Sequence, residues 1–534
     1  MAIGRLPRYA MIMIRNALTV GMWTLGSRLL GFVRDILIAI LLGAGPAADA
    51  FFVALRLPNL FRRLFGEGAF SAAFVPEYTG RLAQAGEVPA QRLAEEITAL
   101  MAVWLVAITV AGMIFMPLLL HLLAPGFTVD PAKFFLTIHL ARITFPYVLL
   151  ICLSALFAGV LNARGHFAAA ASAPILFNIC IIGTLLLLYR AGVAPADALS
   201  YGVVLAGILQ LLLLSWALLR AGTTIRLLRP RLTPGAKIVL RRLGPGLIGA
   251  SVTQLNLTVD TIIASLLPTG TVSVLYYADR VNQLPLGVIG AALGTVLLPT
   301  LSRAIHVGEH GVARETLNRA IQFSLLFTLP SATALAIIGL PIMQALFNHG
   351  AFTSVDAARS AAALAAYAFG LPAFVLIKLF TPGFFARGDT KTPVQIGFAT
   401  VALNLALNLA LMHPLQQIGI ALSTSLAAWF NSLLLGFFLS RRGDFVIDQR
   451  VVGRTLRTVA ACLVMTIVLL LLHGLEAGTS VHDLNLIILI LAGFASFSGA
   501  ALALGALRID ELTEFLSRRQ KGGETKLDPA RGTG

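Results

Sequence analysis

Charged side chains stand inside segments that are otherwise apolar enough to cross a membrane. A charge at the centre of a membrane helix costs about 2.5–3.5 kcal/mol on insertion scales, so such a residue faces a cavity or a partner. These charges gather in the first two predicted helices and in the seventh and eighth. They are Arg28, Arg34, Asp35, Asp49, Arg56, Arg62, Arg63, Glu67, Asp260, Asp279 and Arg280.

Some of these charges can pair with one another, which is the purely structural alternative. Arg63 and Glu67 lie four residues apart on one helix and can form an ion pair. Arg34 and Asp35 are adjacent, so we expect their side chains to point apart, and Arg28 lies two turns from Asp35. The arginines that exceed their expected partners are Arg28, Arg34, Arg56, Arg62 and Arg280. Because a guanidinium binds phosphate or pyrophosphate as a fork, this surplus favours an anionic ligand.

A second polar group lies in the seventh and eleventh predicted helices. Asp260 is in the seventh, while Asn404 and Asn408 lie four residues apart on one face of the eleventh. A carboxylate with amide oxygens could bind a sodium ion, or Asp260 could carry a proton. The alternative is hydrogen bonding between helices without a bound cation.

The elements that must position these residues are membrane-spanning helices. The chain is 58% hydrophobic and 12% charged, whereas soluble domains carry about 25% charged residues. We predict an all-α polytopic membrane protein with about fourteen transmembrane helices, since a span needs roughly 20 apolar residues. The predicted helices are 12–42, 46–78, 94–124, 134–161, 168–189, 198–219, 238–267, 271–302, 316–348, 357–386, 392–412, 417–440, 451–474 and 485–507.

Positive charge alternates along the loops between these helices. The N-terminal tail and every second loop, through to the C-terminal tail and counted together with the helix ends that border them, hold 29 lysines and arginines, and the other loops, counted in the same way, hold three. This positive-inside pattern predicts a membrane protein with both termini in the cytoplasm. It also accounts for the net charge of +16 without nucleic acid as a partner.

The two halves of the chain share an internal repeat. Asp35 and Asp260 begin similar segments 225 residues apart, and Ala163-Arg164-Gly165 recurs as Ala386-Arg387-Gly388 after 223 residues. The repeat predicts two pseudo-symmetric six-helix lobes around a central cavity, as in transporters with parallel repeats. We expect an N-terminal lobe over residues 1–222 and a C-terminal lobe over 223–445. Two additional helices over 446–508 and a cytoplasmic tail over 509–534 would follow.

No motif in the sequence indicates an enzyme. There is no Walker A pattern, so ATP is not expected as the direct source of energy. The histidines and the three cysteines show no metal-ligand spacing, and no nucleophile elbow is present. Transport would then depend on an ion gradient, the membrane potential or consumption of the product.

Several longer motifs resemble those of one family, the MurJ (MviN) family of lipid II flippases. These motifs are Ser27 to Asp35, Ala48 to Ala54, Leu57 to Phe70, Tyr276 to Arg280, Pro382 to Phe385 and Lys391 to Pro393. The second-helix motif, from Leu57 to Phe70, is long and specific. The matches extend from the first predicted helix to the eleventh.

The resemblance implies a function. Members of this family belong to the multidrug/oligosaccharidyl-lipid/polysaccharide exporter superfamily and move lipid II, an undecaprenyl-pyrophosphate-linked disaccharide-pentapeptide, to the periplasmic leaflet by alternating access. The resemblance places substrate-binding roles on Arg28, Arg34, Arg62 and Arg280, with Asp35, Asp49 and Glu67 as lesser candidates, and a cation site on Asp260, Asn404 and Asn408. It implies that the two additional helices over 446–508 form a groove for the lipid tail. It implies no cofactor beyond coupling to a monovalent cation or the membrane potential.

Partners and alternatives follow from the same resemblance. The expected partners are lipid II, membrane lipids and the cell-wall synthesis machinery. A flippase for another undecaprenyl-linked glycan remains open. A drug or cation antiporter of the same superfamily would require an acid-dominated cavity. A non-transporting scaffold would tolerate changes in the arginines.

Overall fold

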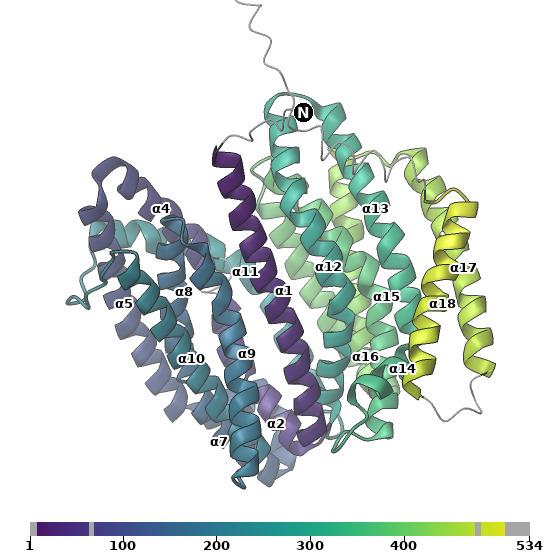
Figure 1. Ribbon diagram of the computed structural model, residues 1–534, viewed down its shortest axis with the longest axis horizontal. Helices are drawn as coiled ribbons and strands as arrows, with labels where there is room; N and C mark the ends of the chain where they lie inside the picture. The colour runs from purple at the N-terminus through teal and green to yellow at the C-terminus, as the bar shows by residue number, and fades with distance from the viewer. Residues whose placement is uncertain (1–7, 64–68, 476–481, 508–534) are drawn as a thin grey trace, which may run out of the picture.

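The computed structural model describes residues 8–63, 69–475 and 482–507, and these ranges contain helices and connecting segments but no β-strand. Nine helices within them are long and apolar enough to cross a membrane. The predicted all-α polytopic class is therefore confirmed. In Figure 1 the helices before α11 gather on one side of the molecule, and those after α11 gather on the other.

The helices divide at the connection between α10 and α11. The N-terminal half contains α1 (Arg8–Leu42), α2 (Pro46–Ala54), α3 (Arg56–Phe61), α4 (Ala69–Ala85), α5 (Glu87–Ile114), α6 (Met116–Leu123), the 3₁₀ helix η2 (Pro125–Val129), α7 (Pro131–Thr144), α8 (Tyr147–Ala163), α9 (Phe167–Arg190) and α10 (Pro195–Arg220). The C-terminal half contains α11 (Pro234–Ser265), α12 (Thr271–His306), α13 (His310–Ile337), α14 (Gly339–Phe347), α15 (Ser354–Phe385), α16 (Lys391–Arg441), α17 (Gln449–Leu475) and α18 (His482–Ala503).

The second predicted helix is not continuous. It comprises α2, α3 and α4, with a break at Leu55 and π-helical residues at 62 and 63. Pro58 has no N–H to donate to the carbonyl of Ala54. The Thr144 hydroxyl donates to that carbonyl instead, at 3.4 Å. The helix is therefore interrupted one turn before Pro58, next to the carbonyl that this proline leaves without its usual donor.

Two predicted helices, 392–412 and 417–440, form the single element α16. Its two arms meet at Gln416, whose φ of 48° interrupts the helical backbone. Pro414 lies two residues earlier and removes another backbone donor. The sharp reversal returns the second arm alongside the first, and both predicted helices are present.

The internal repeat extends to breaks that the sequence comparison did not use. Phe115 separates α5 from the short helix α6, and Ile338, 223 positions later, separates α13 from the short helix α14. The repeated turns also match, because Gly165 and Gly388 both have positive φ, 82° and 74°. Glycine adopts this conformation without a Cβ clash. The two halves therefore share local geometry as well as residue types.

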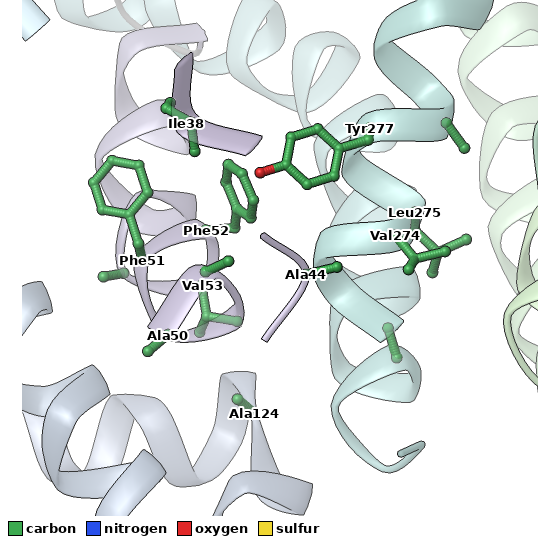
Figure 2. Packing of buried hydrophobic residues seen from close by; sticks show 14 of the residues in the cluster. Ile38, Ala44, Ala50, Phe51, Phe52, Val53, Ala124, Val274, Leu275 and Tyr277 are labelled. Carbon is green, nitrogen blue, oxygen red and sulfur yellow. The ribbon is translucent and has the colours of Figure 1, made fainter. Parts of the chain in front are cut away.

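A large buried core joins the two halves where α2 packs beside α12. Phe52 stacks on Tyr276 with ring centroids 3.9 Å apart and meets Tyr277 edge-on at 5.7 Å. Figure 2 shows Tyr277 directed toward Phe52, with Val274 and Leu275 on the same helix. We call this region the turn end, because the turns at residues 43–45, 268–270 and 348–352 meet there.

The helix α11 connects the halves along its length. Near its start, the Arg242 guanidinium lies 3.3 Å from the Glu77 carboxylate of α4 in the N-terminal half. Near its end, Asp260 is bonded to α16 in the C-terminal half. We call the end of the molecule that holds the connection 221–233 the linker end.

Two further helices pack on the outside of the C-terminal half. In Figure 1, α17 and α18 lie beside one another next to α13. Buried Met465 and Leu469 of α17 contact Leu489 of α18 and Ile338. The guanidinium of Arg454 donates to the Gln322 amide oxygen of α13 at 3.1 Å.

Candidate functional site

The Asp35 carboxylate is the centre of a polar cluster between the two halves. It is fully buried, and it accepts hydrogen bonds from Tyr276 at 3.0 Å and from Arg280, both on α12. Arg34 also donates to it, at 2.8 and 3.0 Å. The expectation that Arg34 and Asp35 point apart is therefore wrong. The Asp35 carboxylate points at α12, and the Arg34 side chain is long enough to fold back along α1 and reach it.

The cluster extends to a third helix. Arg34 donates from its remaining terminal nitrogen to the Asn178 amide oxygen of α9 at 3.0 Å. The Asn178 amide nitrogen in turn donates to the Ser27 carbonyl of α1 at 2.9 Å. The orientation of Arg34 is thus held from both sides, so it would lose less side-chain entropy on binding a ligand than a mobile arginine would.

Pairing lowers the surplus of arginine charge that the sequence indicates. Arg34 and Arg280 share the single carboxylate of Asp35, so these three residues carry one net positive charge. The Arg280 side chain stays 29% exposed and that of Arg34 13% exposed, while Asp35 is inaccessible. Both arginines can therefore meet a ligand from the open side while Asp35 holds them in place.

Arg28 stands apart from this cluster. It is exposed, and its terminal nitrogen occupies the space that a side chain would fill at Gly287 of α12. Lys378 of α15 is close enough to interact electrostatically with Arg28. Within the part of the chain that the structure describes, no hydrogen bond or ion pair occupies Arg28. It therefore offers a guanidinium to an anion next to a second cation that sequence analysis did not select.

The other arginines of the second predicted helix have partners nearby. Arg62 donates to the Asn59 amide oxygen of α3 at 3.4 Å and is partly buried. Arg56 donates to the Leu257 carbonyl of α11. Neither residue contacts Asp35. Glu67, with its expected pairing to Arg63, lies outside the described residues.

Asp49 occupies a different place from the other candidates. Its buried carboxylate accepts from the Lys133 ammonium of α7 at 2.7 Å. It also accepts from the backbone of Gly270 at 2.7 Å and from the backbone and hydroxyl of Ser273 at 2.9 and 2.6 Å. A carboxylate at the first turn of a helix satisfies backbone donors and complements the helix dipole. Asp49 therefore joins the halves at the turn end and is not available to a ligand in this conformation.

Asp260 and the two asparagines do come together. One oxygen of the carboxylate accepts from Asn404 at 2.7 Å and from Asn408 at 2.8 Å. The other accepts from the Thr424 hydroxyl at 3.1 Å, on the second arm of α16. The amide oxygens of both asparagines are buried without a hydrogen-bond partner among the described residues. Because the oxygen and nitrogen of an amide exchange places when the group rotates, the same three side chains and Thr424 can present oxygens to a cation.

Four residues of these clusters escaped the sequence analysis: Asn178, Tyr276, Thr424 and Lys133. Asn178 and Thr424 are polar residues within apolar helices, which is a usable signal. Lys133 was assigned to a loop, and only the fold places it against Asp49. Tyr276 was noted only as the first residue of the motif Tyr276 to Arg280. In the described ranges no group of three or more histidine, cysteine or acidic side chains is arranged to hold a metal.

Comparisons with known proteins show the family of this chain. A model of the family described as lipid II flippase MurJ matches residues 38–491. The chain belongs to the MurJ lipid II flippase family. It is 41% identical to a probable lipid II flippase MurJ of Rhizobium meliloti (strain 1021), over 95% of this chain and 97% of the relative. It is 36% identical to a lipid II flippase MurJ of Burkholderia cenocepacia, over 82% and 85% of the two chains.

Solved structures extend the comparison to the fold. A lipid II flippase MurJ in an inward closed conformation aligns with a TM-score of 0.78 and 26% identity, over 91% of this chain and 98% of that one. An inward-facing transporter of the multidrug resistance MATE family aligns with a TM-score of 0.67 and 15% identity, over 78% of this chain and 94% of that one. The second likeness concerns the fold alone.

Proposed function

We propose that this protein is a flippase that moves lipid II from the cytoplasmic to the periplasmic leaflet. The observation that carries the proposal is the Asp35 cluster, in which Arg34 of one half and Arg280 of the other share a buried carboxylate. A pyrophosphate has two negative groups and suits guanidinium forks. It would bind at the exposed side of the two arginines, with Arg28 and Arg62 as further contacts.

Alternating access then requires the two halves to act as lobes that rock about a central cavity. In this conformation the halves are joined at the turn end by Asp49 and the start of α12. Neutralising the arginines with a pyrophosphate would lower the repulsion between them and favour closure on the opposite side. Opening of the turn end would follow when Asp49 releases Gly270 and Ser273.

We propose the bacterial inner membrane as the location, with both termini in the cytoplasm. The support is the ratio of 29 to three basic residues between alternate loops, counted with the helix ends that border them. In that orientation the turn end faces the periplasm and the linker end faces the cytoplasm. The lipid tail would lie along α17 and α18, and contacts with the cell-wall synthesis machinery would form on the outer surface.

The return of the empty carrier is proposed to use a monovalent cation, or the membrane potential, at Asp260. A sodium ion there would take the place of the amide N–H groups that now donate to Asp260. The unpartnered oxygens of Asn404 and Asn408 would then turn toward the ion. Sodium chloride should then raise the melting temperature of the purified protein relative to choline chloride. Asp260→Asn should remove this difference. An equal response to both salts in the intact protein would contradict a sodium site.

The test of the main proposal is complementation in cells depleted of their own lipid II flippase. Arg280→Ala and Arg34→Ala should each lower the amount of lipid II that an externally added lipid II-cleaving enzyme can reach. Loss of a charge-assisted bond worth about 1.5–3 kcal/mol corresponds to a decrease of about 10- to 100-fold. Arg280→Lys keeps the charge without the fork and should give an intermediate value.

A matched control keeps the assay interpretable. Arg319→Ala also removes an arginine from an ion pair, but one that is 62% exposed on α13, and it should behave as the intact protein. Full activity of well-expressed Arg34→Ala and Arg280→Ala variants would refute the arginine mechanism. Failure of the intact, membrane-inserted protein would instead indicate another undecaprenyl-linked substrate.

A further inference from the structure

The connection between α10 and α11 carries a surface that the transport mechanism does not use. Residues 226–232, which we call the linker patch, form neither helix nor strand, and every one of them is exposed. In Figure 1 this connection projects from the outer edge of the N-terminal half. The patch has the sequence Arg226-Leu227-Leu228-Arg229-Pro230-Arg231-Leu232.

Its composition combines apolar and basic side chains. Leu227 is 75% exposed and Leu232 is 55% exposed, while Leu228 is at 37%. No acidic residue occurs between Asp197 and Asp260 in the chain. Within the described ranges, the guanidinium groups of Arg226, Arg229 and Arg231 have no ion pair. Leucines beside free arginines suit a surface with an apolar interior and an anionic outer layer.

The ends of the patch are held while its side chains stay free. The Glu95 carboxylate accepts from the backbone N–H of Arg226 at 3.2 Å. The Thr233 hydroxyl donates to the Glu96 carboxylate at 2.7 Å. Both acids belong to α5, and both are engaged at the ends of the patch. The exposed leucines therefore belong to a segment whose two ends are anchored on α5.

The depth of the patch relative to a membrane follows from the helix before it. Trp216 near the end of α10 is 51% exposed, and the Arg220 guanidinium lies 4.2 Å from the centre of its ring. Tryptophan concentrates at the level of lipid headgroups, and arginine beside it reaches toward phosphates. The patch begins six residues after Arg220, and Pro230 and Pro234 prevent it from continuing as a helix. It therefore starts at the headgroup level.

We propose that the linker patch binds the anionic glycerophospholipids of the cytoplasmic leaflet, with its leucines inserted between headgroups and its arginines on lipid phosphates. This inference requires the linker end to face the cytoplasm and does not depend on which lipid is transported. By holding the start of α11, it fixes the N-terminal half at the membrane surface. The other half can then move relative to an anchored one.

The experiment places a fluorescent reporter in the patch of the full-length protein. Leu227→Cys is labelled with an environment-sensitive dye, which the three native cysteines do not compete for because they are buried. The protein is reconstituted in vesicles of phosphatidylcholine alone, or of phosphatidylcholine and phosphatidylglycerol in equal amounts. The dye should become brighter and blue-shifted with phosphatidylglycerol, spin-labelled lipid should quench it, and high salt should reverse the effect.

Two variants test the chemistry. Each arginine near an anionic surface strengthens binding by about fivefold, so changing Arg226, Arg229 and Arg231 together to Gln should weaken it by on the order of 100-fold. The matched control is Val129→Cys, an 87% exposed apolar position in η2 without arginine neighbours, which should not respond to phosphatidylglycerol.

Three results would overturn the proposal. The emission of the dye at position 227 could remain that of a dye in water in both kinds of vesicle, which would leave the patch free for a protein partner. The response could persist in the triple glutamine variant. The dye could also respond only when undecaprenyl pyrophosphate is added to vesicles of phosphatidylcholine alone. The patch would then bind the headgroup of the substrate and not anionic glycerophospholipids. The lipid II assay on the triple variant separates this surface from the Asp35 cluster, since none of its residues belongs to that cluster.

Discussion

At the scale of single residues, Asp35 determines how the arginines of the two halves are presented. Burying a carboxylate without cationic partners would cost free energy of folding, and the two guanidinium groups would repel one another without the carboxylate. The shared arrangement lets each arginine keep an exposed edge. Asp35, which was expected to contact substrate, is therefore better described as the residue that positions Arg34 and Arg280.

Asp35→Asn should destabilise the protein and lower transport. The change leaves Arg34 and Arg280 without a counter-ion, at a cost of about 1–3 kcal/mol because both arginines keep some contact with solvent. The melting temperature in detergent should fall. Glu315→Gln removes a carboxylate from an ion pair that is 59% exposed and should leave the melting temperature almost unchanged. Equal effects of the two changes would contradict the positioning role.

At the scale of elements, the start of α12 is held by a carboxylate from α2 and a lysine from α7. Lys133 also lies 3.9 Å from the ring centre of Phe127, so the ammonium has favourable contacts on two sides. Asp49 and Lys133 both belong to the N-terminal half, while Gly270 and Ser273 belong to the other. When the turn end opens, Asp49 would lose its donors on α12 and keep Lys133. The lysine thus makes opening less costly.

A double-mutant cycle tests this pairing. Lys133→Met leaves a buried, uncompensated carboxylate and should cost about 3–5 kcal/mol of stability. Asp49→Asn in the same chain should restore part of the loss, because the amide carries no charge. Melting temperatures of the single and double variants give the coupling between the sites. Additive losses would show that the two side chains act independently.

At the scale of the whole molecule, the halves approach closely at the turn end because glycine is present there. A side chain on Gly270 would come within 2.3 Å of the Ala44 carbonyl in the other half, and one on Gly43 within 2.3 Å of the Ala351 carbonyl. Both glycines have positive φ. Closure of this end therefore depends on the absence of two Cβ atoms.

Gly270→Ala should separate the halves at the turn end. The expected result is faster labelling of Ala44→Cys by a membrane-impermeant thiol reagent, since Ala44 is buried in the closed arrangement. Gly308→Ala is the matched control, because Gly308 also has positive φ, 81°, but a Cβ there meets no atom within 4 Å. Both changes carry the backbone strain of about 1 kcal/mol. Similar labelling rates in the two variants would refute the role of close approach.

Much of this organisation could be read from the sequence. The membrane class follows from composition, because an apolar chain must satisfy its backbone within helices. The repeat follows from motifs at a constant offset, and it led correctly to two halves with matching turns at Gly165 and Gly388. The polar group of Asp260, Asn404 and Asn408 was also identified, because spacing of four residues places both asparagines on one helical face.

The sequence by itself determined which residues must avoid lipid, since a charge in an apolar helix is costly wherever the helix lies. Only the tertiary structure decided which partners those residues have. It paired Arg34 with its neighbour Asp35, assigned Asp49 to the start of α12, and placed Lys133 beside it. The reason is that pairing depends on distances between side chains of different helices, and these are set by packing across the two halves, not by spacing within one helix.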